Sequence, residues 1–247
     1  MNGHPLLEAR GVTVRFGGLV AVDQVSAAFA AGELVGIIGP NGAGKTTFFN
    51  ALSGVTAPSS GELFAQGRRL SGARAHRYAE LGVARTFQTP RVFAELPVAA
   101  NIDFGLQFAG RGRSGSWLLK DEASILHLIG LADQARLPAA AITPSQQRLL
   151  EIGMALATRP KVLLLDEVAA GLTEAEVDSM AQLIRRLRDE LDLTVIWIEH
   201  AVTTLLRYVE RVIVLHQGRK IADGAPAAVV RDAEVIEAYL GDEMVAA

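Results

Sequence analysis

A glycine-rich segment that ends in lysine and threonine carries the clearest chemistry in the sequence. Residues 39–46 read Gly-Pro-Asn-Gly-Ala-Gly-Lys-Thr and match the pattern G-x-x-x-x-G-K-[ST] in full. Glycines let the backbone curl so that successive N–H groups point at phosphate oxygens, and a helix starting near Lys45 presents its positive end to the same anion. Lys45 adds a mobile positive charge, and Thr46 adds a hydroxyl ligand for Mg²⁺. The segment therefore predicts a nucleotide phosphate site, although the pattern alone does not separate kinases, GTPases, motor ATPases and transport ATPases. The residues expected to bind the phosphates are Gly39, Pro40, Asn41, Gly42, Ala43, Gly44, Lys45, Thr46 and Thr47.

Two adjacent acids form the second chemical feature. Asp166 and Glu167 directly follow the fully apolar run Val162–Leu165. In open α/β sheets, ligands bind at the edge where the strands end, so both acids are expected there. Asp166 can hold Mg²⁺, and Glu167 can orient or deprotonate an attacking water. The alternative is the start of a solvated loop, which the phosphate segment elsewhere in the chain disfavours.

His200 closes another apolar strand-like run, Thr194–Ile198, after Glu199. At a sheet edge a histidine can hydrogen-bond a terminal phosphate and respond to its loss. The competing interpretation is a polar strand end. No cysteine and no HExxH pattern accompany the histidines, so the sequence does not predict a histidine metal cluster.

Apolar strand-like runs alternate with helix-like segments along the chain. This alternation predicts an α/β fold with a mostly parallel sheet and helices on both faces. The expected strands include residues 12–16, 34–38, 162–165 and 194–198, a short strand within 81–88, a strand pair or loop at 62–70 and a hairpin over 211–222. One helix is expected to begin near residue 45. Further helices are expected over residues 98–108, 118–131, 146–158 and 174–191.

Residues 89–145 differ in composition from the rest, being rich in Ala, Leu and Gly. They predict a helical insertion, with 110–116 as a flexible connector. A length of 247 residues suits one domain that carries such an insertion. Lys and Arg total 24 against 27 Asp and Glu, so the chain lacks the basic excess expected of a nucleic-acid binder. We find no secretion signal and no apolar run of about 18 residues, so any membrane role is expected to come through a partner.

Taken in order, these features resemble the ATP-binding cassette family. About 40 residues after the phosphate segment, Arg85-Thr-Phe-Gln88 looks like the glutamine loop of that family, and Asp166 follows Lys45 by about 120 residues. The resemblance spans about residues 7 to 241. It implies a P-loop NTPase (RecA-like) core, an N-terminal antiparallel β-subdomain and an inserted α-helical subdomain. The single domain, 1–247, then divides into a catalytic core (1–88 and 159–247) and a helical subdomain (89–158).

The resemblance also implies roles for individual residues. Phe16 is expected to stack on the adenine of ATP, the alternative being a core residue at a strand end. Gln88 is expected to join Thr46 and Asp166 around Mg²⁺ and to couple the site to a membrane subunit, the alternative being an ordinary loop residue. Glu167 and His200 are the expected catalytic residues.

A narrower resemblance is to the ATPase subunits of branched-chain amino-acid importers. It is carried by Arg85–Phe93, Ala157–Pro160, Ala169–Leu172 and the C-terminal Val235-Ile-Glu-Ala-Tyr-Leu-Gly241. It implies a second ATPase subunit as partner (a heterodimer, with a homodimer as the alternative), two membrane permease subunits and, indirectly, a periplasmic or lipoprotein solute-binding protein. The implied location is peripheral, on the cytoplasmic side of the inner membrane. Lipopolysaccharide-export ATPases share much of this pattern, and a non-transport cassette protein is the third, least favoured interpretation.

The chain departs from the family where the signature segment normally reads Leu-Ser-Gly-Gly-Gln. Here the segment is Ile142-Thr-Pro-Ser-Gln146. In the family this segment contacts the ATP held by the partner subunit, so Thr143, Pro144, Ser145 and Gln146 are the expected contacts. Proline lacks an N–H and serine lacks the freedom of glycine, which predicts a weaker composite site. Thr173 and Val168 also replace the usual Asp and Pro. Tolerated drift and functional asymmetry between two ATP sites remain the two explanations.

Overall fold

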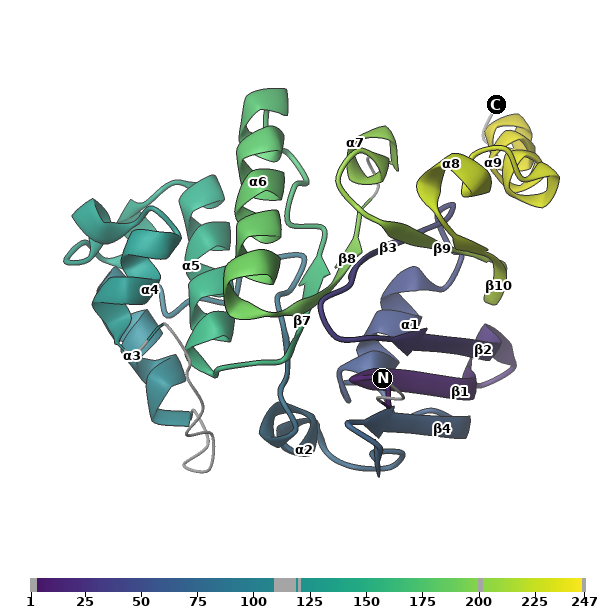
Figure 1. Cartoon of the computed structure of the whole chain (residues 1–247), viewed down its shortest axis with the longest axis horizontal. Helices are drawn as coiled ribbons and strands as arrows, with labels where there is room; N and C mark the ends of the chain where they lie inside the picture. The colour runs from purple at the N-terminus through teal and green to yellow at the C-terminus, as the bar shows by residue number, and fades with distance from the viewer. Residues whose placement is uncertain (1–3, 109–118, 120, 200–201, 246–247) are drawn as a thin grey trace.

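A six-stranded sheet forms the centre of the computed structural model, which describes residues 4–108, 119, 121–199 and 202–245 (Figure 1). Its strand order is β10-β9-β3-β8-β7-β6, and all neighbours are parallel except β10 and β9. The strands are β3 (Leu34–Ile38), β6 (Val83–Arg85), β7 (Val162–Asp166), β8 (Thr194–Ile198), β9 (Arg211–His216) and β10 (Arg219–Gly224). The predicted mostly parallel sheet is confirmed. Every residue of β3, β7 and β8 is buried, as expected for strands covered on both faces.

A smaller antiparallel sheet, in the order β2-β1-β4-β5, is formed from the N-terminal part of the chain. Its strands are β1 (Leu7–Phe16), β2 (Leu19–Phe29), β4 (Ser60–Ala65) and β5 (Arg68–Arg69). Alternate residues of β3 face two different cores: Val35 and Ile37 join the core shared with the small sheet, whereas Leu34 and Ile38 join the core on the opposite side. Helix α1 (Lys45–Leu52) buries Phe48 and Phe49 in the shared core, which holds the two sheets together.

Helices cover the opposite face of the large sheet and extend beyond one end of it (Figure 1). They are α3 (Val98–Phe108), α4 (Glu122–Leu128), α5 (Pro144–Ala157), α6 (Glu174–Leu191), α7 (Val202–Leu206), α8 (Pro226–Val229) and α9 (Ala233–Val245). Helix α2 (Ala75–Glu80) instead buries Tyr78 in the core shared with the small sheet. Helices α3 and α5 pack closely at two glycines: a Cβ at Gly105 would lie 2.8 Å from the carbonyl oxygen of Met154, and one at Gly153 would lie 2.7 Å from Ile102.

Helix α4 is shorter than the predicted helix over 118–131. Asp121 caps its first turn by accepting from the Ser124 N–H at 2.9 Å, and its end is followed by Gly130 with a φ of +73°. The cap and the glycine set the limits that apolar periodicity alone did not reveal. The predicted flexible connector over 110–116 lies outside the described residues.

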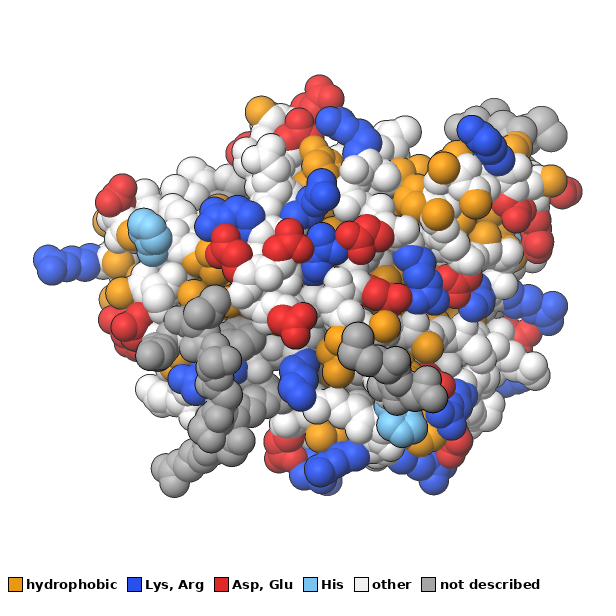
Figure 2. Space-filling view, in the orientation of Figure 1, with side chains coloured by type: hydrophobic (Ala, Val, Ile, Leu, Met, Phe, Trp, Pro, Cys, Tyr) orange, Lys and Arg blue, Asp and Glu red, His pale blue; other side chains and the backbone are white. Residues whose placement is uncertain are grey.

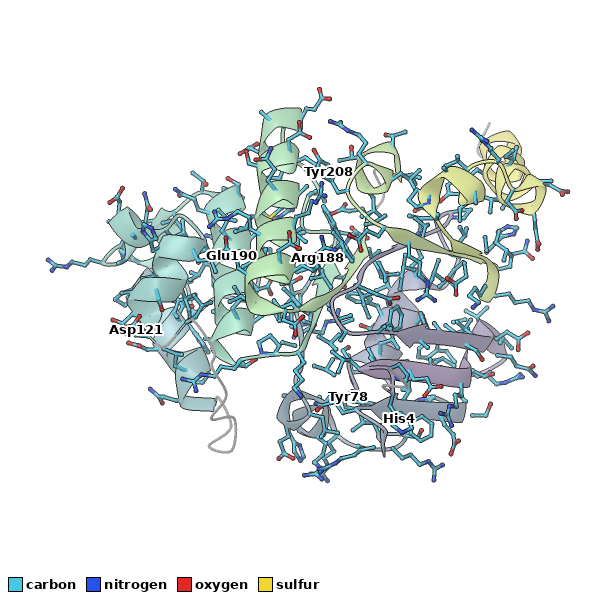
Figure 3. The ribbon with its side chains drawn as sticks, viewed as in Figure 1. His4, Tyr78, Asp121, Arg188, Glu190 and Tyr208 are labelled. Atoms are coloured by element: carbon cyan, nitrogen blue, oxygen red, sulfur yellow. The ribbon has the colours of Figure 1, made fainter. Side chains whose placement is uncertain are left out.

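Helix α6 is fastened by polar contacts to the segment that precedes β9. The side chain of Arg188 forms an ion pair with Glu210, and the hydroxyl of Tyr208 donates a hydrogen bond to Asp178. Figure 3 shows Arg188 and Tyr208 between α6 and the chain leading from α7 into β9. These contacts fix the helix against the segment that leads into β9.

The surface face in Figure 2 carries acidic and basic side chains intermingled, without a field of one sign. Among the described residues, no helix combines the length and the apolar character that crossing a membrane requires.

Candidate nucleotide-binding site

The loop between β3 and α1 has a backbone that requires glycine at two positions. Gly39 and Gly44 have positive φ angles of +151° and +93°. A Cβ at Gly39 would lie 2.0 Å from the carbonyl oxygen of Leu215, and one at Gly44 would lie 2.3 Å from that of Ala21. Gly44 is also the N-cap of α1, and no side chain caps this helix. The first N–H groups of α1 therefore have no partner within the helix or from a capping side chain, and they can bind an anion.

Lys45 is buried within this loop. Its side-chain nitrogen donates to the carbonyl oxygens of Gly39 at 2.6 Å and Pro40 at 2.9 Å. Burial lowers the pKa of Lys45, and the nearby carboxylate of Glu167 opposes that shift. The ammonium group thus lies inside the curl of the loop, within reach of an anion bound by its N–H groups.

Asp166 and Glu167 lie at the same edge of the sheet as the loop, since β7 and β3 are parallel and separated by β8. Both acids are buried, at 3% and 5% exposure. Glu167 has a positive φ of +51°, so the chain turns sharply where the strand ends. The electrostatic effect of Glu167 on Lys45 agrees with the expectation that the acids face the phosphate loop.

Gln88 comes together with Glu167 although 79 residues separate them in sequence. The Nε2 of Gln88 donates to Oε2 of Glu167 at 2.7 Å. Gln88 lies in the loop that follows β6, the strand next to β7. Gln88 is an exposed residue, and its amide contacts the buried carboxylate of Glu167.

Arg85 is a site residue to which the sequence assigned no role of its own. Its Nη2 donates to Oδ2 of Asp166 at 2.8 Å, and its Nη1 donates to Oδ1 of Asn50 at 2.7 Å and Oγ of Ser53 at 2.9 Å. Burial lowers the pKa of Arg85, while Asp166 acts in the opposite direction. Arg85 therefore links the end of α1 to the acidic end of β7. Its place in the Arg-Thr-Phe-Gln segment was the available signal.

Glu199 is a second residue that sequence reasoning missed. Its Oε1 accepts from the backbone N–H of Ala169 at 2.7 Å and from Nε1 of Trp197 at 3.0 Å. Burial raises the pKa of Glu199. The carboxylate holds the segment that follows Glu167. An acid at the end of an otherwise apolar strand was the signal for it.

Phe16 and His200 are the two remaining residues expected to contact ATP. Phe16 is 53% exposed at the end of β1, so its interpretation as a core residue is wrong and its ring is accessible. Strand β2 approaches the phosphate loop, because the carbonyl oxygen of Ala21 lies beside Gly44. His200 lies outside the described residues.

The signature segment starts helix α5 with a capping box. Thr143 is the N-cap: its hydroxyl accepts from the Gln146 N–H at 3.2 Å, and Oε1 of Gln146 accepts from the Thr143 N–H at 3.0 Å. Pro144 occupies the first helical position, where its missing N–H costs the helix no hydrogen bond. The departure from glycine thus gives a well-formed helix start. Within the described residues, no hydrogen bond joins this segment to the phosphate loop.

Two of the departures from the family pattern are joined through Glu176. Thr173 caps α6, and its N–H and hydroxyl donate to Oε2 of Glu176 at 2.9 and 2.8 Å. The hydroxyl of Ser145 also lies near Glu176, and the Thr173 hydrogen bonds together with this hydroxyl lower the pKa of that carboxyl. The signature segment is therefore connected to the start of α6.

The residues expected around Mg²⁺ offer a hydroxyl (Thr46), an amide (Gln88) and a carboxylate (Asp166). Such oxygen donors suit Mg²⁺. Among the described residues, no three His, Cys, Asp or Glu side chains gather as a metal cage. A small number of protein oxygens fits a cation that is held mainly by phosphate oxygens and water.

Comparison with known proteins agrees with this geometry. Residues 22–170 match the ABC transporter family, and residues 219–245 match the family described as branched-chain amino acid ATP-binding cassette transporter. A crystal structure of an ATP-binding cassette from an ABC transporter in its ADP conformation superimposes with a TM-score of 0.84 at 28% identity, covering 96% of this chain and 98% of that chain. The chain belongs to the ATP-binding subunits of ABC transporters and is an ATPase with the P-loop fold of that family.

Individual relatives match over nearly the whole chain. The high-affinity branched-chain amino acid transport ATP-binding protein BraF of Pseudomonas aeruginosa is 37% identical, over 96% of this chain and 98% of its own length. LivG of Escherichia coli, with the same description, is 38% identical over the same shares of the two chains. The lipopolysaccharide export system ATP-binding protein LptB of Acidithiobacillus ferridurans is 34% identical, again over 96% and 98%.

Proposed function

We propose that this chain is the ATPase subunit of an importer for branched-chain amino acids or related small polar or amphipathic solutes. The observation that supports ATP hydrolysis best is the convergence of Lys45, Glu167 and Gln88 at one edge of the sheet. The import of amino acids is supported by the match of residues 219–245, which include β10 and α9, and by the relatives that carry that description.

In this proposal the phosphate loop binds the triphosphate of ATP and Phe16 stacks on adenine. Lys45 moves from the carbonyl oxygens of Gly39 and Pro40 to the β- and γ-phosphates, where it neutralises charge. Glu167 orients or deprotonates the attacking water, and Gln88 fixes the orientation of the Glu167 carboxylate. His200 contacts the γ-phosphate.

When bound, Mg²⁺ would neutralise phosphate charge, and Thr46, Gln88 and Asp166 would hold it, in part through water. Arg85 prepares this arrangement because its ion pair with Asp166 keeps the carboxylate at the sheet edge. The signature residues Thr143, Pro144, Ser145 and Gln146 contact the ATP of the second ATPase subunit, which is a different chain or a second copy of this one.

We also propose that residues 1–88 and 159–247 form the catalytic core and 89–158 a helical subdomain of one domain. An apolar surface on that subdomain, formed by Phe93, Leu96, Phe104 and Leu137, supports contact with a permease subunit. These four side chains are between 41 and 45% exposed, and the rings of Phe93 and Phe104 pack edge to face at 4.7 Å. Phe87 and Val92, which lie in the loop before this surface, are half-buried: Phe87 packs against two arginines and Val92 against the core.

The complete assembly would contain two ATPase subunits, two permease subunits and an external solute-binding protein, with this chain peripheral on the cytoplasmic side of the inner membrane. Closure of the two ATPases around ATP would move the permeases, and hydrolysis would reset them.

The test is reconstitution of the chain with its co-purifying membrane subunits in liposomes. We expect ATPase activity that requires Mg²⁺, is lost in Lys45→Ala and rises when a binding protein loaded with leucine, isoleucine or valine is added. Activity that responds to lipopolysaccharide instead would assign the export function described for LptB. Absence of Mg²⁺-dependent ATP binding to the purified chain would contradict the assignment of the site.

A further inference from the structure

A buried carboxylate outside the proposed reacting groups holds the loop that carries Gln88. Glu151 lies in the middle of α5 and is 5% exposed. Its Oε1 accepts from the backbone N–H of Phe87 at 3.2 Å and from that of Arg91 at 3.0 Å, and its Oε2 lies 3.3 Å from the Phe87 nitrogen. Because these two amides flank Gln88, a single side chain fixes the backbone on both sides of it.

This loop depends on side chains for its conformation. Strand β6 ends at Arg85, and residues 86–93 belong to no helix or strand. Backbone N–H groups that leave a sheet still need acceptors, and Glu151 supplies one for two of them. Two guanidinium groups contact the ring of Phe87, that of Arg85 at 4.5 Å and that of Arg91 at 3.9 Å from its centroid. The loop is therefore anchored at its backbone by α5 and at Phe87 by two arginines.

The anchoring reaches the proposed reacting groups through Gln88. Its Nε2 lies 2.7 Å from Oε2 of Glu167, so a shift of the loop backbone would change how the Glu167 carboxylate is held. At its other end α5 begins with the signature segment, capped by Thr143. Glu151 thus lies on the helix that connects the partner-facing segment to the loop of this chain's own site.

We propose that Glu151 is a positioning residue for Gln88 that couples helix α5 to the arrangement of Gln88 and Glu167. This role rests on the function proposed above for those two residues. It explains why an acid occupies a position where an apolar side chain would be buried without an electrostatic cost. Burial raises the pKa of Glu151 to about 7, and the amides of Arg91 and Phe87 act against that shift.

The first test compares Glu151→Leu, which removes the acceptor, with Glu151→Gln, which keeps one oxygen. The purified full chain is assayed for ATPase activity alone and with its permease subunits. In Glu151→Leu we expect kcat to fall about 10- to 100-fold, as when a supporting hydrogen bond to a site residue is lost. The KM for ATP should stay within about twofold, because the phosphate loop is untouched. Glu151→Gln should regain most of the rate. Met154→Leu, on the same helix, is the control and should match the wild type.

Amide hydrogen exchange gives a readout independent of turnover. The N–H groups of Phe87 and Arg91 should exchange faster in Glu151→Leu, while those of β7 should not change. If Glu151→Leu does not fold, Glu151→Asp replaces it, since the shorter side chain cannot reach both amides. A folded Glu151→Leu or Glu151→Asp with wild-type kcat would overturn the proposal.

A double-mutant cycle separates positioning from general stabilisation. If Glu151 acts through Gln88, adding Glu151→Leu to Gln88→Ala should lower kcat no further. Multiplication of the two effects would overturn the role of Glu151. If Gln88→Ala alone leaves kcat unchanged, the function proposed for Gln88 fails instead, and amide exchange would still report on the contact with α5.

Discussion

Two helices of this molecule begin at segments that the family uses to bind ATP, and they begin in opposite ways. Helix α1 starts at Gly44, with a φ of +93° and no capping side chain, so its first amides remain available to an anion. Helix α5 starts at Thr143 with a capping box, a proline and a hydrogen bond from the Gln146 N–H to the Thr143 hydroxyl. One helix start is open and the other is closed by its own side chains.

Under the proposed function, in which two ATPase subunits share each ATP site, the difference predicts which half of such a site this chain supplies in full. Its phosphate loop keeps the glycines that the backbone requires. Its signature segment has proline and serine in place of the family's glycines and starts a helix stabilised by a capping box. The open amides of α1 can bind phosphate without rearrangement. A phosphate of the partner's ATP can reach the Gln146 amide of α5 only if the capping box opens, which costs about 1 kcal/mol.

The largest expected effect is the loss of Glu167, the acid proposed to orient or deprotonate the attacking water. Glu167→Gln should lower kcat by about 10²- to 10³-fold, since a side chain that orients or deprotonates water contributes about this much. ATP affinity should change little, because Lys45 and the loop remain. Steady-state hydrolysis and fluorescent-nucleotide titration measure the two quantities. Glu174→Gln, an exposed acid on α6, is the control. An unchanged rate in Glu167→Gln would mean that the site at this chain's phosphate loop does not limit hydrolysis. The contrast between the phosphate loop and the signature segment would then have no functional meaning.

A methyl group at the start of α1 tests why that helix start must stay open. Gly44→Ala places a Cβ 2.3 Å from the carbonyl oxygen of Ala21 at a positive φ, so we expect the free energy of unfolding to fall by about 2 kcal/mol and ATP binding to weaken at least about tenfold. Gly17→Ala has a positive φ of +58° but no atom within 4 Å, so it isolates backbone strain from the clash. Denaturant unfolding and ATP titration distinguish them. Equal effects of the two variants would refute the steric argument.

The sequence predicted those elements that are marked by a local pattern of residue types. The apolar runs of β3 and β8 and the spacing of Lys45 and Asp166 follow from local pattern, and the structure has both strands at the predicted residues. Helix ends that are set by a cap, as at Asp121, were predicted less well because apolar periodicity continues past them. Residues that act through hydrogen bonds to segments far away in the sequence were missed altogether.

Arg85, Glu151 and Glu199 illustrate that last limit. Each is a charged side chain whose partners lie far away in the sequence: Glu151 bonds amides about 60 residues distant, and Glu199 bonds one 30 residues distant. Which amides the two glutamates reach depends on the packing of α5 and β8 against the loops, and no local pattern encodes that. The two glutamates are marked in the sequence by an acid in or just after an apolar helix or strand, and Arg85 is marked by its place in the Arg-Thr-Phe-Gln segment.

The stability of the chain should depend on pH through Glu151, which joins the closed helix α5 to the open site. Its pKa is raised from 4.5 to about 7, so the folded form keeps a proton that the unfolded form has lost between these values. The stabilisation from that proton is complete below about pH 4.5 and is lost as the pH rises through about 7. Between about pH 4.5 and pH 7, the free energy of unfolding of the wild type should fall by on the order of 2 kcal/mol relative to that of Glu151→Gln. Urea unfolding of both proteins at pH 5 and pH 8 measures it, and parallel changes would contradict it.

The smallest expected effect bears most directly on the closed helix start. Pro144→Gly with Ser145→Gly restores the glycines of the family signature and adds a backbone N–H at residue 144. If the signature limits one ATP site, the ATPase rate of the assembled complex should rise about two- to fivefold, although the chain loses about 1 kcal/mol of stability. Pro226→Gly, at the first turn of α8, reproduces the stability loss away from the site and should leave the rate unchanged.

An unchanged rate in the double-glycine variant would favour tolerated drift, because the added N–H then donates to nothing that limits turnover. Ser145→Ala distinguishes a further possibility, since it removes the hydroxyl near Glu176 while keeping the proline. If the ATPase rate rises in Ser145→Ala as well, the contact of the signature segment with α6 limits the rate, and the missing N–H of residue 144 does not. A rise only in the double-glycine variant would identify the backbone donor as the group that the closed start withholds from the partner's phosphate.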